Sequence, residues 1–223
     1  MIRMTIEDVV YEIPQDLTVE QWAAAIKFDM GVKAFWPHII HSVTGAPVNL
    51  LKEADDDALE LGVVFIASTM SKREPVEMMA LEEMSFGQYV DLDVYASMGI
   101  DKKFKDILDI IAPEATTAAQ ALYALDKYSV YKKHILNQYR ELFGLDEYEE
   151  DDEPTVSDPM QAAHSWYKII VGLANEDVLK LDEVTAQPLQ KILNFMALQK
   201  QQALEEQERQ RQQRLKYDLQ RAR

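Results

Sequence analysis

The sequence predicts a predominantly α-helical (α+β) protein, with a small N-terminal ββα unit followed by a helical body and an extended C-terminal helix. Apolar and polar residues alternate over residues 2–6, and residues 9–13 form a second β-rich run that Pro14 stops. Beyond residue 18 the apolar residues recur at helical spacing. The chain has 223 residues, of which 48% are hydrophobic, so it can bury a core.

The composition excludes several classes of protein. The chain contains no Cys, which rules out disulfides and thiolate metal sites and fits a reducing compartment. Acidic residues at positions 7 and 8 interrupt the N-terminus where a signal peptide needs an apolar run, and no later window stays apolar over the roughly 20 residues that a membrane-spanning helix needs. We therefore expect a soluble chain with no membrane partner.

The charge is strongly negative but uneven along the chain. The net charge of −16 disfavours nucleic acid as a partner. Residues 203–223 hold four acidic and six basic residues, a net charge of +2, which leaves −18 for the rest of the chain. This distribution predicts a C-terminal tail that either folds back on the acidic body or meets an acidic partner.

Four segments are expected. Residues 1–50 form the hairpin-plus-helix unit, in which Thr18 and Gln21 have the spacing of a capping box and the apolar face around Trp22 covers the hairpin. Residues 51–145 form a helical domain, with acidic residues 55–57 at the start of a helix. Residues 146–157 form an acidic linker, because seven of the eight residues 146–153 are acidic and repel one another. Residues 158–223 form a C-terminal helical segment.

The last helix is expected to begin near Pro188 and to become entirely polar. From residue 205 to residue 214 no apolar side chain occurs. A helix that is polar on every side has no face to pack on a core, so this segment either projects into solvent or binds a partner.

The stretch SFGQYVDLDVY, residues 85–95, allows two interpretations. Ser85 and Gln88 have capping-box spacing, which predicts a helix starting at Phe86. Alternation of Val90, Leu92 and Val94 with polar residues equally fits a strand, and so short a run does not decide between them.

No catalytic or cofactor motif occurs in the sequence, so the protein is expected not to be an enzyme and to use no cofactor. The nucleophile elbow and the phosphate-binding and dinucleotide-binding glycine motifs are all absent. His38 and His41 stand three residues apart without a third ligand nearby, and packing explains them better than a metal site. Asp91 and Asp93 diverge on a helix, so a catalytic carboxylate pair has no support.

Three segments in this order carry a resemblance to a known family: YEIPQDLTVEQWAAAI, SFGQYVDLDVY, and WYKIIVGLANEDVLKLDEV continuing through QPLQKILNFM into a charged helix. Together they resemble the tail and baseplate-hub assembly proteins of contractile-tailed bacteriophages. The resemblance implies an assembly protein or chaperone that binds baseplate hub or tape measure proteins as the tail initiates, located in the host cytoplasm during assembly.

An alternative from another class is a permanent virion component, in the tail or baseplate, whose C-terminal helix contacts neighbours or copies of itself. In both cases the expected partner-binding residues lie around the central stretch, in the later aromatic segment and in the basic tail: Phe86, Tyr89, Asp91, Asp93, Trp166, Arg209, Arg211 and Arg214. For Phe86 and Tyr89, a place in the hydrophobic core is the competing interpretation.

Overall fold

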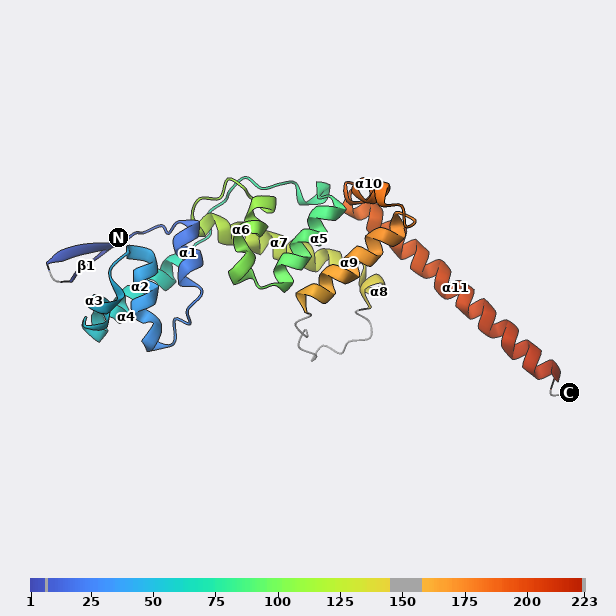
Figure 1. Cartoon of the computed structure of the whole chain (residues 1–223), viewed down its shortest axis with the longest axis horizontal. Helices are drawn as coiled ribbons and strands as arrows, with labels where there is room; N and C mark the ends of the chain where they lie inside the picture. Colours follow the sequence, from blue (N-terminus) through green and yellow to red (C-terminus); the bar gives the residue numbers. More distant parts are fainter. Residues whose placement is uncertain (7, 145–157, 222–223) are drawn as a thin grey trace. The chain divides into compact units, whose positions relative to one another are not determined.

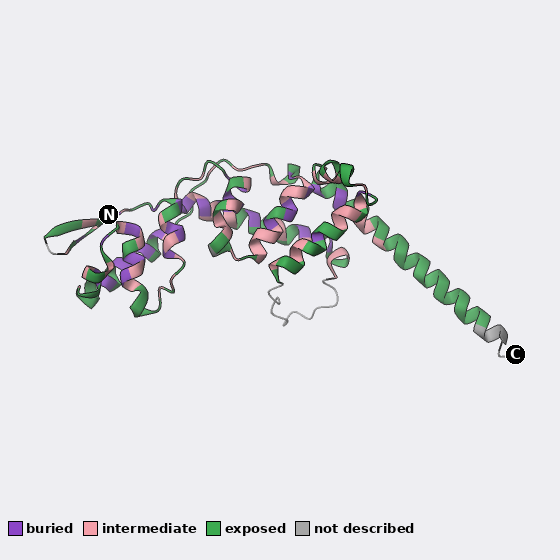
Figure 2. Cartoon of the chain, viewed as in Figure 1, coloured by how far each residue is buried: buried purple, intermediate pink, exposed green. Residues whose placement is uncertain are grey.

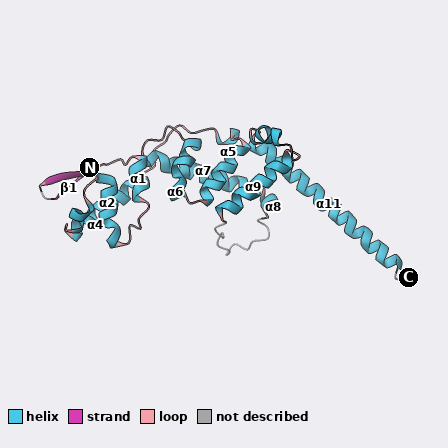
Figure 3. Ribbon diagram, viewed as in Figure 1, coloured by secondary structure: helices cyan, strands magenta, loops and turns pink. Residues whose placement is uncertain are grey.

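The computed structural model describes residues 1–6, 8–144 and 158–221 (Figure 1). Its secondary structure is predominantly helical, with one two-stranded antiparallel sheet at the N-terminus and a long helix at the C-terminus (Figure 3). The fold class predicted from the sequence is therefore confirmed. The acidic linker predicted at residues 146–157 lies outside the described residues.

The chain divides into two compact units. Unit 1 comprises residues 1–81 and 92–130, and unit 2 comprises residues 82–91 and 131–223. This division differs from the segments expected from the sequence, because unit 1 continues past residue 50 and residues 51–145 are shared between the units. Each unit is built from segments far apart in the sequence, which local periodicity does not reveal.

Most of the strands and α-helices that begin in unit 1 are short, and the longer ones are α4, α6 and α7. Their bounds are β1 Ile2–Ile6, β2 Val9–Ile13, α1 Val19–Ala25, α2 Trp36–Thr44, α3 Val48–Lys52, α4 Asp56–Met70, α6 Ile100–Ile111 and α7 Ala118–Gln138. Helix α5, Phe86–Ser97, begins in unit 2, and α7 ends there. The remaining α-helices belong to unit 2: α8 Arg140–Phe143, α9 Pro159–Leu173, α10 Leu181–Thr185 and α11 Leu189–Arg221.

The hairpin packs mainly on α2 and α4. Its strands pair in antiparallel register from Ile2 opposite Ile13 to Ile6 opposite Val9, β2 contacts α2, and β1 contacts α4. The sequence pattern assigns the covering of the hairpin to the face around Trp22 on α1. Trp22 is buried and packs edge-on against Phe104 of α6, with 5.5 Å between the ring centroids, whereas the main helix contacts of the hairpin are with α2 and α4.

Close packing in this part of unit 1 depends on a glycine. A Cβ atom built on Gly62 of α4 would lie 3.1 Å from Cδ1 of Ile40, 3.3 Å from Cδ1 of Ile13 and 3.4 Å from Sδ of Met4. These three side chains come from α2, β2 and β1. The missing side chain at Gly62 therefore lets α4 approach both the hairpin and α2.

Replacing Gly62 with valine is expected to lower the free energy of unfolding by about 1–3 kcal/mol, because the added methyl groups overpack this contact. Gly172, in the exposed last turn of α9, is the matched control, since a Cβ atom added there would meet no other atom within 4 Å. Gly172→Ala should be neutral or stabilise by up to about 1 kcal/mol through helix propensity. Urea denaturation followed by circular dichroism measures both, and equal effects would contradict this packing account.

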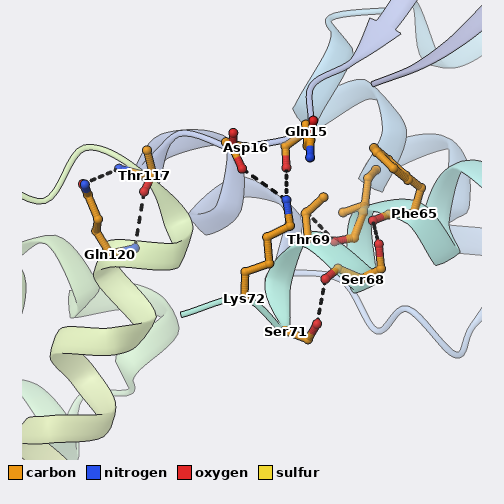
Figure 4. A network of polar contacts seen from close by, with 10 residues as sticks. Gln15, Asp16, Phe65, Ser68, Thr69, Ser71, Lys72, Thr117 and Gln120 are labelled. Atoms are coloured by element: carbon orange, nitrogen blue, oxygen red, sulfur yellow. Dashed lines mark hydrogen bonds and ion pairs between the residues drawn. The ribbon is translucent and has the colours of Figure 1, made fainter. Parts of the chain in front are cut away.

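Three helices begin with the same reciprocal cap. The Thr18 hydroxyl accepts from the Gln21 backbone N–H while the Gln21 side chain accepts from the Thr18 N–H. Ser85 and Gln88 exchange the same two bonds at 3.2 and 3.0 Å, and Thr117 and Gln120 do so at 3.3 and 3.4 Å (Figure 4). Each pair satisfies backbone N–H groups that a helix start otherwise leaves unpaired. The cap at Ser85 settles residues 85–95 as the helix α5.

In unit 1, two of these helix starts pair with each other. Thr18 and Thr117 form an antiparallel bridge. Its two backbone hydrogen bonds run from the Val19 N–H to the Thr116 carbonyl at 3.1 Å and from the Ala118 N–H to the Leu17 carbonyl at 2.8 Å. The first N–H of α1 and the first N–H of α7 thereby gain partners.

Unit 2 repeats this arrangement with different residues. Ser85, before α5, bridges Pro188, before α11. The Phe86 N–H donates to the Gln187 carbonyl at 2.8 Å, and the Leu189 N–H donates to the Met84 carbonyl at 2.9 Å. In both units the fourth residue after the cap is an aromatic one in an edge-on contact: Trp22 on Phe104, and Tyr89 on Trp166. The bridge in unit 2 anchors the start of α11.

Candidate protein-interaction surfaces

The expected aromatic binding residues gather in the interior of unit 2. Trp166 of α9 makes edge-on contacts with Phe86 at 5.8 Å and with Tyr89 at 5.9 Å between ring centroids. Phe86 is 0% exposed, Tyr89 1% and Trp166 8%. The structure thus places these three residues in the core of unit 2, which was the competing interpretation for Phe86 and Tyr89. They are not part of the surface that is open to a partner.

The two carboxylates of the central stretch lie on different sides of α5. Asp91 is exposed, although partial desolvation raises the pKa of its carboxyl above the ordinary range. Asp93 is half-buried. Of the central residues predicted to bind a partner, Asp91 is the most accessible, and Asp93 is partly accessible.

Helix α11 has a buried base. Leu189 and Leu193 are 1% and 0% exposed, and the Tyr139 hydroxyl donates to Asn194 Oδ1 at 2.8 Å. Farther along, Lys200 donates to the Glu141 carbonyl of α8. These contacts hold the first three turns of α11 on the other helices of unit 2.

Beyond Lys200 the helix leaves the body of unit 2. Every residue from 201 to 217 is exposed, and Figure 2 shows this part of α11 as a single exposed rod. We call residues 201–221 the arm. Within unit 2, the described part of the arm does not fold back on the other helices; folding back was one of the two alternatives from the sequence. Arg209, Arg211 and Arg214, predicted to bind a partner, all lie on it.

The arm is stabilised by contacts within its own helix. Arg209 pairs with Glu206 at 3.4 Å, and side-chain amides donate to glutamates four residues away, as in the bond from Gln212 to Glu208 at 3.3 Å. Such pairs favour an isolated helix. A shallow hollow of about 300 Å³ lies along it, lined by Gln207, Gln210, Arg211, Arg214 and Leu215.

Tyr139 and Tyr131 of unit 2 differ in how their hydroxyls are satisfied. Replacing Tyr139 with phenylalanine removes the bond to Asn194 and is expected to lower the free energy of unfolding by about 1 kcal/mol. The hydroxyl of Tyr131 is buried and has no hydrogen-bond partner among the described atoms. Tyr131→Phe is therefore the control, expected to be neutral or stabilising in urea denaturation; an equal loss from both variants would contradict this account.

The same tyrosines predict a pH dependence. Burial raises the pKa of both hydroxyls above 10.0, and the nearby Glu82 carboxylate adds to the effect at Tyr131. The folded state therefore favours the neutral phenols, and their contribution to stability is complete below pH 10.0 and is lost as the pH rises through the folded-state pKa values. Alkaline denaturation should be shallower in Tyr139→Phe than in the unaltered protein.

A groove between β1 and helices α3 and α4 was not predicted from the sequence. It has a volume of about 470 Å³ and runs along all five residues of β1. The opposite wall includes Leu50, Ala54, Ala58 and Leu61. The alternation of apolar and polar residues over 2–6 predicts the strand β1, but it does not predict a groove beside that strand.

The polar contacts around the end of α4 are structural. Lys72 donates to the Gln15 carbonyl at 2.9 Å and to the Asp16 carboxylate at 3.2 Å (Figure 4). Arg73 pairs with Asp126 of α7 at 2.5 Å. These bonds tie the end of α4 to the segment after β2 and to α7, all within unit 1.

The histidine pair makes packing contacts. His38 stacks on Phe28 with 5.4 Å between ring centroids, and Nδ1 of His41 lies 2.8 Å from the Ala46 carbonyl oxygen. Over the part of the chain that the structure describes, no group of three or more His, Asp or Glu side chains is arranged to hold a metal ion.

Comparison with known proteins gives no match to any family model, any curated protein or any solved structure. Among the described helices, none combines the length and apolar character needed to cross a bilayer.

Proposed function

We propose that the protein is a non-catalytic phage tail assembly protein or chaperone that binds baseplate hub or tape measure proteins during tail initiation in the host cytoplasm. The observation that carries the proposal is the arm, a helix whose residues 201–217 are all exposed. The resemblance of residues 11–26, 85–95 and 166–196 to such assembly proteins supplies the class of partner.

The chemistry of the arm fits a contact with another helix. Its exposed surface offers arginines and glutamates together with Leu204 and Leu215, which are 54% and 56% exposed. Helices in grooves and coiled coils are recognised through such apolar positions flanked by charges. The acidic remainder of the chain keeps the protein soluble while the arm stays accessible.

Co-expression with the hub and tape measure proteins of the same phage, followed by affinity capture, tests the proposal. We expect one of them to co-purify with the protein. Folded protein that captures neither would contradict it. Mass spectrometry of mature particles then distinguishes a transient assembly protein, absent or at low copy number, from the alternative of a permanent tail or baseplate component.

A further inference from the structure

The arm carries a regular seam along one side. Its members are spaced alternately by three and four residues, and they are Gln201, Leu204, Glu208, Arg211 and Leu215. This is the spacing of the a and d positions that face a partner in a two-stranded coiled coil. Neither Leu204 nor Leu215 is covered, as more than half of each side chain is exposed.

The seam is complementary to a second copy of itself that runs in the opposite direction. Leu204 and Leu215 are equally distant from its midpoint, which falls between residues 209 and 210, and so are Glu208 and Arg211. In an antiparallel coiled coil the a positions of one helix lie opposite the d positions of the other. A second arm running in the opposite direction would place leucine opposite leucine and glutamate opposite arginine, each contact occurring twice.

We propose that the arm binds the arm of a second copy of this chain, as an antiparallel two-stranded coiled coil centred between residues 209 and 210. This interface goes beyond the proposed function, because its occupant is the chain itself. Since it buries the same two leucines, an arm paired with a second copy is not available to a tail protein at the same time. Its core is two leucine layers, and its centre is two reciprocal pairs between Glu208 and Arg211.

Charge decides the direction of the two helices. A parallel pair in register would place Glu208 and Arg211 each opposite its own copy, with like charges in both central layers. The antiparallel pair replaces both of these layers with attractive ones. It also places the two strongly acidic bodies, each −18 before residue 203, at opposite ends of the coil, where their repulsion is smaller.

Charge substitution at the seam tests the interface by sedimentation over a concentration series. The unaltered full-length chain should dimerise. Arg211→Glu places a second carboxylate opposite Glu208 twice per dimer and should weaken self-association by about tenfold to a hundredfold. Lys216→Glu makes the same charge change one residue outside the seam and should have little effect. The double variant Glu208→Arg with Arg211→Glu restores opposite charges and should restore the dimer.

Cross-linking tests the direction independently, on a chain that contains no native Cys. Leu204→Cys combined with Leu215→Cys should give a disulfide-linked dimer. Leu204→Cys alone should not, because the two copies of residue 204 would lie about 16 Å apart along the helix axis, beyond the reach of a disulfide.

A chain that stays monomeric into the millimolar range, a dimer that Arg211→Glu leaves unchanged, or efficient cross-linking through residue 204 alone would each overturn the proposal. Circular dichroism of each variant verifies that the arm remains helical. Capture of a tail protein by a strictly monomeric chain would leave the proposed function intact and remove only this interface.

Discussion

Replacing Trp166 with alanine is expected to lower the free energy of unfolding of unit 2 by about 3–5 kcal/mol, the range for removing a large aromatic side chain from a core. Trp166 is 8% exposed and holds both Phe86 and Tyr89 in edge-on contacts. Its loss leaves a cavity against α5, close to the bridge that anchors α11. Urea denaturation followed by circular dichroism measures the change.

The adjacent residue supplies the matched control. Tyr167 lies on the same helix and is 57% exposed, so Tyr167→Ala removes an aromatic side chain of similar size from the surface and should change stability by about 0.5 kcal/mol or less. If the two variants proved equally stable, Trp166 would not be part of the core of unit 2.

Ending the chain at Lys200 is expected to abolish capture of the tail protein while leaving the free energy of unfolding within about 0.5 kcal/mol of the full-length value. The shortened chain keeps the buried base of α11, including Leu193 and the bond between Tyr139 and Asn194. It loses only residues whose described side chains are exposed.

Affinity capture after co-expression and urea denaturation give the two readouts for this truncation. Undiminished capture by the shortened chain would remove the arm from the binding surface. A large loss of stability would instead show that the arm supports the fold of unit 2.

Features set by neighbouring residues could be predicted from the sequence. The hairpin follows from alternation over residues 2–6 and the stop at Pro14, and the caps at Thr18 and Ser85 follow from partners three residues away. The exposure of the arm follows from the absence of apolar residues over 205–214. In each case the determining interactions, or their lack, lie within one or two helical turns.

Features that depend on distant residues could not be predicted in this way. The bridges pair residue 18 with 117 and residue 85 with 188, and no local pattern specifies such a partner. Packing of Phe86 and Tyr89 on Trp166 likewise joins α5 to α9, so the aromatic stretch could be described from sequence equally well as surface or as core. The covering of the hairpin by α2 and α4 depends on Gly62, whose effect arises only when three elements meet.

Hydrogen exchange of residues 201–217 tests the central claim most directly, namely that the arm is a docking element for another chain. Measured on dilute, monomeric protein, the amides of this segment should exchange with little protection, and they should become protected when a captured tail protein is bound. Strong protection in the isolated monomer, or unchanged exchange in the complex, would contradict the claim.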